Sequence, residues 1–85
     1  MRVAANRDQV AQQVRSIVAE ILNIFPGRVD ETSTWQSLEA DGFNIEVITQ
    51  AIRKRLQVEA TTDDIESCRT IDDIIDYLMG QPQLA

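Results

Sequence analysis

The chain has 85 residues, of which 14 are acidic, 8 are basic and 44% are hydrophobic, and its net charge is −6. This describes one small soluble domain over residues 1–85, with a core over about 8–80, too short to enclose a cavity for a large substrate. Histidine is absent, which excludes Ser-His and Cys-His pairs and most zinc sites, so we expect neither an enzyme nor a metal site.

The charge is unevenly distributed. Residues 30–52 carry −5 and residues 58–85 carry −6, whereas 53–57 carry +3 from Arg53, Lys54 and Arg55. An acidic domain repels phosphate backbones, and three cations are too few to reverse this. We therefore expect a protein partner with basic patches rather than nucleic acid, the alternative being a charged surface that serves solubility alone.

The first predicted helix covers Gln9 to Phe25. Its apolar residues follow the spacing of one helix face, with polar residues on the other side. Asp8 is the predicted N-cap, and Pro26-Gly27 is predicted to end the helix. The apolar face consists of Val10, Val14, Ile17, Val18, Ile21 and Leu22.

Residues 26–40 are predicted to form an ordered surface loop rather than a further element. The segment begins with Pro26-Gly27 and continues with the polar run 30–34, both typical of loops. Leaving Trp35 in water would forgo about 2–3 kcal/mol, so we expect it to plug the loop onto the helices. Stacking of Trp35 on a ligand is the alternative.

A second helix is predicted from Gly42 to about Leu56, with Asp41 as its N-cap. The Asp41 carboxylate also complements the positive end of the helix dipole, and the basic residues 53–55 complement the negative end. The apolar positions cover more than one narrow stripe, so some should remain partly exposed. They are Phe43, Ile45, Val47, Ile48, Ala51, Ile52 and Leu56.

Two capping signatures follow. Thr61 and Asp64 predict a short helical turn, and Thr70 with Asp73 opens a last helix that Gly80 and Pro82 end. The Asp-rich runs lack the ligand spacing of an EF-hand loop, so capping explains them better than calcium binding. The sequence therefore predicts an all-α fold with three longer helices, one short third helix and a long first loop.

The single Cys68 cannot form an intrachain disulfide, and an inert thiol explains it better than a reactive one. Residues Met1 to Gln13 contain no continuous apolar run, so we expect neither a signal peptide nor a membrane anchor there. These features favour a cytoplasmic protein.

Residues 38–44, Leu-Glu-Ala-Asp-Gly-Phe-Asn, resemble the Leu-Gly-x-Asp-Ser-Leu-x segment of acyl carrier proteins. Residues 17–22 resemble the first-helix signature of that family, Trp35 matches an aromatic residue before the Leu, and residues 70–78 are similar to the final helix. The resemblance covers about residues 10–80. It implies a small four-helix bundle with a short third helix, in agreement with the elements above.

The resemblance also implies a site. In the family, the Ser hydroxyl of the Asp-Ser-Leu run is esterified with 4′-phosphopantetheine, but the corresponding residue here is Gly42, after Asp41. Glycine offers no oxygen, so we expect no cofactor. The alternative attachment residues are Ser37, which precedes the capping turn, and Thr49, about two turns into the helix.

The chain departs from the family pattern elsewhere. Glu39 replaces a glycine, Phe43 replaces a leucine, and Asn44 stands where an acidic residue is common, which favours a natural divergent member over deliberate inactivation. The family's second helix usually ends in carboxylates that meet basic patches on synthases and transferases. Residues 53–55 reverse that charge and indicate a different partner.

We therefore hypothesise a monomeric docking module that binds a synthase or acyl-transfer enzyme in fatty-acid, polyketide or lipid metabolism. The candidate contact surface is Phe43, Glu46 and Val47 together with Arg53, Lys54 and Arg55. Phe43 filling the core is the alternative for that residue. The second hypothesis is a genuine acyl or aminoacyl carrier, with 4′-phosphopantetheine on another residue or with the attachment Ser replaced at Gly42.

Overall fold

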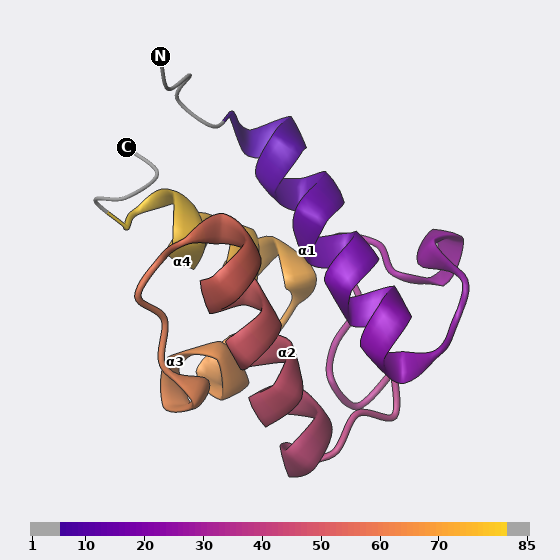
Figure 1. Ribbon diagram of the computed structural model, residues 1–85. Coiled ribbons are helices and arrows are strands. Elements are labelled where there is room, and N and C mark those ends of the chain that lie inside the picture. The colour runs from indigo at the N-terminus through magenta and orange to yellow at the C-terminus, as the bar shows by residue number, and fades with distance from the viewer. Residues whose placement is uncertain (1–5, 82–85) are drawn as a thin grey trace.

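The computed structural model describes residues 6–81, and within them the fold is entirely helical (Figure 1). The predicted all-α, four-helix architecture is confirmed, including the short third helix. The helices are α1 (Arg7–Leu22), α2 (Gly42–Leu56), α3 (Thr62–Ser67) and α4 (Ile71–Met79), with a 3₁₀ helix, η1 (Pro26–Arg28), after α1.

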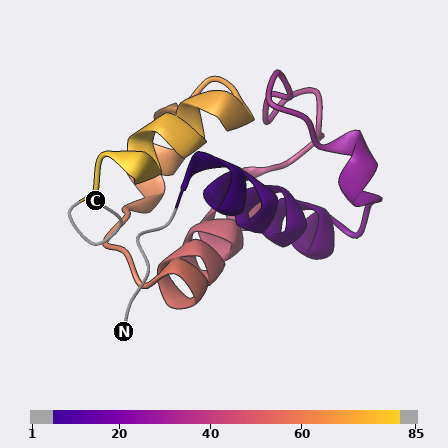
Figure 2. The same ribbon diagram turned by 90° about the horizontal axis from the view of Figure 1, so that it is seen from above.

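Helix α1 is the centre of the bundle. It packs against both α2 and α4, while α3 packs against α2. Figure 2 shows α1 between α4 and α2 when the molecule is seen from above. Helices α1 and α2 run in opposite directions, so the end of α1 and the start of α2 lie at the same end of the molecule (Figure 1).

The core forms where the apolar faces of the helices meet. Each Å² of apolar surface that these side chains remove from water stabilises the fold by about 25 cal/mol. This burial is the main stabilising contribution in a domain of this size. The largest fully buried side chains come from all four helices and the first loop: Val10, Val14, Ile17, Val18, Val29, Ile48, Ile52, Ile65, Ile71, Ile74, Ile75 and Leu78.

The predicted bounds of the first helix were wrong at both ends. The N-cap is Asn6 and not Asp8: the Asn6 side chain accepts a hydrogen bond from the Gln9 N–H at 2.8 Å, and the Gln9 side chain accepts one from the Asn6 N–H at 3.2 Å. The helix ends at Leu22 because Asn23 adopts a left-handed conformation with φ 57°, three residues before Pro26. Ile24 and Phe25 therefore lie outside it.

The N-terminal turns predicted for the other helices are confirmed. Asp41, Thr61 and Thr70 each cap their helix by accepting a hydrogen bond from the backbone N–H three residues later. Helix α4 ends at Met79 with Gly80 as its C-cap, as predicted, whereas Pro82 lies outside the described residues.

The segment between α1 and α2 is tied to the bundle. Three of its residues, Pro26–Arg28, form η1, so the prediction of a loop without a further element was wrong there. The Trp35 side chain is partly buried and its indole N–H donates to the Ile65 carbonyl of α3 at 3.2 Å, as expected for a plug. Two loop carbonyls also accept hydrogen bonds from the first amides of α4. Ser33 accepts from the Ile71 N–H and Glu31 accepts from the Asp72 N–H, both at 2.9 Å.

Ion pairs connect α1 to its neighbours. The Arg7 guanidinium binds the carboxylates of Asp76 and Asp72 on α4, and its hydrogen bonds, with Asp76 first, raise the pKa of Arg7. Near the other end of α1, Glu20 binds Arg55 of α2 at 2.8 Å. These exposed pairs orient the helices more than they stabilise them.

The turn before α2 contains a strained residue. Glu39 has φ 57°, a left-handed conformation that a β-carbon disfavours by about 1–2 kcal/mol. We expect Glu39→Gly to raise the free energy of unfolding by about 1 kcal/mol, because glycine has no β-carbon that would come too close to the backbone carbonyl oxygen in this conformation. Urea denaturation checks it. Glu39→Ala is the matched control, which removes the charge but keeps the β-carbon; an equal gain in that variant would assign the effect to charge rather than to the backbone.

Candidate functional site

The start of α2 is held by a reciprocal cap. The Asp41 carboxylate accepts from the Asn44 N–H at 2.8 Å, and the Asn44 side-chain oxygen accepts from the Asp41 N–H at 3.1 Å. This pattern is a capping box in which Asp and Asn take the places of the usual Ser/Thr and Glu/Gln. The capping box gives Asn44, which departs from the family pattern, a structural role at the start of α2.

Gly42 is the first residue of α2 and is exposed. A β-carbon placed there would meet only the Glu66 carboxylate, at 3.9 Å, and none of the described glycines has a positive φ. Neither space nor backbone conformation therefore requires glycine. The position can accommodate a serine, although the chain presents no side-chain oxygen there.

The two alternative hydroxyl groups lie elsewhere. Thr49 is 1% exposed, and its hydroxyl donates to the Ile45 carbonyl one turn earlier at 2.8 Å. Ser37 is exposed in the loop, where its hydroxyl donates to the Thr34 carbonyl at 2.9 Å and accepts from the Thr34 N–H at 2.8 Å. Neither hydroxyl lies at the start of α2.

The predicted contact residues at the start of α2 reach the surface. Phe43 is 72% exposed, so the alternative in which it fills the core was wrong. Glu46 is exposed and Val47 is half-buried on the same helix. An exposed phenylalanine beside a partly exposed valine forms a small apolar area of the kind used in protein contacts.

The structure distinguishes among the three basic residues at the end of α2. All three are exposed, but Arg55 turns toward α1 and forms the ion pair with Glu20. Arg53 and Lys54 form no ion pair with any residue in 6–81. They border a shallow hollow of about 320 Å³ that Gln50 and Val58 complete. The sequence placed all three cations together, and the fold brings only two of them to this hollow.

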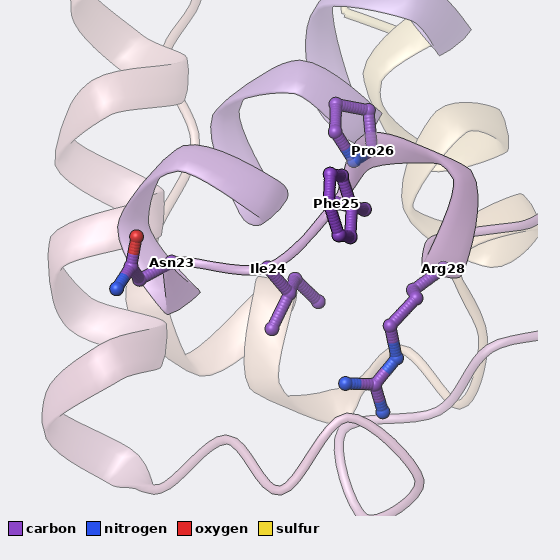
Figure 3. Close-up of a pocket in the computed structure, with 5 residues that line it drawn as sticks. All are labelled: Asn23, Ile24, Phe25, Pro26 and Arg28. Carbon is purple, nitrogen blue, oxygen red and sulfur yellow. The ribbon is translucent and has the colours of Figure 1, made fainter.

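A second hollow lies at the end of α1, at some residues that the sequence analysis did not single out. It is formed by Asn23, Ile24, Phe25, Pro26 and Arg28, and Figure 3 shows these side chains around the turn between α1 and η1. Phe25 is 81% exposed. The apolar run that continued the first helix in the sequence hid this exposure, although the αL-tolerant Asn23 was a signal for it.

Cys68 and Tyr77 both meet Asp64 of α3. The Cys68 thiol donates to the Asp64 carbonyl at 3.3 Å, and burial together with the negative charges of Asp73 and Asp64 raises its pKa. The Tyr77 hydroxyl donates to the Asp64 carboxylate at 2.9 Å, and burial raises its pKa as well. A thiol with a raised pKa has little thiolate at neutral pH, so its reactivity is low.

Residues 6–81 show neither a metal-binding cluster nor a membrane-spanning helix. No group of three or more Cys, Asp or Glu side chains in this range is arranged to hold a metal ion. None of its helices combines the length and apolar character that crossing a membrane requires.

Comparisons with known proteins identify the family of the chain. A model of the family described as "Phosphopantetheine attachment site" matches residues 12–78. The acyl carrier protein of Chlamydia caviae is 29% identical over 66 residues, covering 76% of this chain and 86% of that protein. The acyl carrier protein of Buchnera aphidicola is 28% identical over 72 residues, covering 84% of this chain and 91% of that protein.

A solved structure also resembles this one. A free-standing peptidyl carrier protein from an uncharacterised secondary metabolic pathway of Acinetobacter baumannii superimposes with a TM-score of 0.78. The match covers 87% of this chain and 92% of the other, at 16% sequence identity. At that identity the likeness concerns the fold.

Proposed function

This chain belongs to the phosphopantetheine attachment-site family of carrier proteins, and from that premise we propose that it is a carrier-fold module without 4′-phosphopantetheine at Gly42 that acts by docking onto a partner protein. Members of the family are carrier modules and not enzymes, so no catalytic residue is assigned. The observation that carries the proposal is the absence of a side-chain oxygen at the first residue of α2.

The residues present do not fit the prosthetic group. Attachment as a phosphodiester needs a nucleophilic oxygen at an exposed place that a modifying enzyme can reach, and Gly42 has none. The Thr49 hydroxyl is buried and bonded to its own helix, and the Ser37 hydroxyl is bonded within the preceding loop. Both features oppose a substitute attachment residue.

The docking role is supported by the exposed face of α2. It carries Phe43, Glu46 and Val47 near its start and Arg53 and Lys54 near its end, whereas Arg55 turns toward α1 and pairs with Glu20. We assign the partner to the synthases and acyl-transfer enzymes of fatty-acid, polyketide or lipid metabolism, in the cytoplasm, because carrier modules work on such enzymes.

One observation favours the second candidate function, a genuine acyl or aminoacyl carrier. The space around Gly42 is open, with only the Glu66 carboxylate at 3.9 Å from an added β-carbon. A carrier whose attachment serine was replaced by glycine would have this open space. The two candidates differ in whether the unaltered chain can be loaded.

Intact-mass measurement after incubation with coenzyme A and a broad-specificity phosphopantetheinyl transferase separates them. We expect the mass of the unaltered chain to remain unchanged, because Gly42 offers no oxygen. A gain equal to the phosphopantetheine arm on that chain would refute the proposal.

Two variants make the same test informative about the surroundings. Gly42→Ser fits the available space, and its modification would show that the surface read by the transferase persists. Gly42→Ala is the matched control, since it adds the β-carbon without the oxygen and should gain no mass.

A further inference from the structure

Helix α2 presents one outward stripe that joins its apolar start to its basic end. At 100° per residue, Val47, Gln50 and Lys54 lie within about 40° of Phe43 around the helix axis. Each of these side chains is exposed or half-buried. The buried side chains of α2 occupy the opposite face: Ile45, Ile48, Thr49 and Ile52.

The same geometry places Arg55 outside the stripe. It lies about 120° from Phe43, on the side that faces α1, and its guanidinium binds Glu20 at 2.8 Å. Arg53 lies about 80° from Phe43 in the other direction and shares with Lys54 and Gln50 the hollow of about 320 Å³. Lys54 is therefore the cation on the stripe, and Arg53, which shares the hollow with it, flanks it within reach of the same partner.

The two ends of the stripe differ in chemistry and are well separated. Phe43, 72% exposed, is the apolar end, and Lys54 lies eleven residues further on, about 16 Å along the axis. A surface that covers both must offer an apolar recess and, at that distance, anionic groups. At physiological salt, charges are screened over about 8 Å, so carboxylates on distant elements act weakly here, while Glu46 on α2 and Glu59, which lines a hollow with Arg53, remain as local negative charges.

We infer that the partner of α2 is a protein surface that places carboxylates against Arg53 and Lys54 and an apolar recess against Phe43. The inference rests on the proposed function in taking α2 as the docking helix. It reverses the basic partner expected from the net charge of −6. Carboxylates fit better than phosphate backbones, because two cations beside Glu46 and Glu59 are too few to hold a nucleic acid.

The sequence offers a specific chemical probe of this contact. Lys54 is the only lysine of the 85 residues, so a carbodiimide, which joins amines to carboxylates without a spacer, can link the peptide only at Lys54 or at the chain's α-amino group, and peptide mapping distinguishes the two. The ligand is a synthetic helical peptide of about 20 residues with two leucines on one face and two glutamates eleven residues further on. A peptide with lysines in place of the glutamates is its control.

With the full chain, we expect the acidic peptide to bind, to form an amide with Lys54, and to shift the backbone NMR signals of the stripe. Arg53→Gln/Lys54→Gln should weaken binding at least about tenfold, and Phe43→Ala about fivefold, whereas Arg55→Gln should stay within about twofold. Lys54→Arg keeps the charge and should retain affinity while losing the cross-link at this position.

Several results would overturn the inference. These are absence of binding by the acidic peptide, equal binding of the lysine peptide, preferential binding of a short duplex DNA, or an equal loss of affinity with Arg55→Gln. No loss of affinity with Phe43→Ala would equally overturn it. The outcome is independent of the mass measurement, since a chain loaded with phosphopantetheine could still show the acidic contact and an unloaded chain could lack it.

Discussion

Replacing Ile48 with alanine is expected to lower the free energy of unfolding by about 3 kcal/mol, because the side chain is fully buried where α2 packs on the bundle. The loss combines the transfer energy of the removed methyl groups with the cavity they leave. A chain of 85 residues has a total stability of about 4–13 kcal/mol, so this is a large fraction of it. Urea denaturation followed by far-ultraviolet circular dichroism measures the change.

Phe43→Ala is the matched control for Ile48→Ala. Phe43 lies on the same helix and loses more atoms, but it is 72% exposed, so its removal should change the free energy of unfolding by less than about 0.5 kcal/mol. Similar losses in the two variants would contradict the orientation of α2. That orientation matters for function, because only an exposed Phe43 is available to a partner.

The second large effect is expected at Trp35. Its side chain packs against the core from the loop and its indole N–H donates to the Ile65 carbonyl at 3.2 Å. We expect Trp35→Ala to cost about 2–3 kcal/mol, below the value for a fully buried tryptophan. Trp35→Phe keeps most of the ring, loses the donor and should cost about 1 kcal/mol. Urea denaturation by circular dichroism is suitable, since the variants lack the indole fluorophore.

Phe25→Ala serves as the control for the loop. Phe25 is also aromatic and follows α1, but it is 81% exposed, and we expect no measurable loss of stability. If Trp35→Ala were equally neutral, Trp35 would not hold the loop on α3, and its alternative role of stacking on a ligand would regain weight.

The sequence predicted the elements whose signals are local. The start of α2 and the turns at Thr61 and Thr70 depend on a capping side chain and a backbone N–H three residues away, so the composition of a few residues determines them. The end of α1 was missed because the local sequence pattern there is misleading. Ile24 and Phe25 continue the apolar spacing, while the helix is ended by an asparagine in a conformation that glycine adopts more often.

The candidate site was predicted in part. The order Asp41-Gly42-Phe43 locates the start of α2 in the sequence, and the structure gives the same start. Helix spacing turns Arg55 away from Lys54, but the pairing of Arg55 with Glu20 was beyond the sequence, because Glu20 lies 35 residues away on α1. Such a pair requires the relative rotation of two packed helices, which spacing within either helix does not contain.

The loop carbonyls that meet the first amides of α4 make distant parts of the chain depend on one another. Ile71 and Asp72 donate to Ser33 and Glu31, and Trp35 donates to α3, so a local opening of this loop would leave polar groups of both helices unsatisfied. The loop, α3 and the first turn of α4 should therefore open together as one cooperative unit. A partner that displaces the loop would therefore loosen α3 and α4 at the same time, although it contacts neither helix directly.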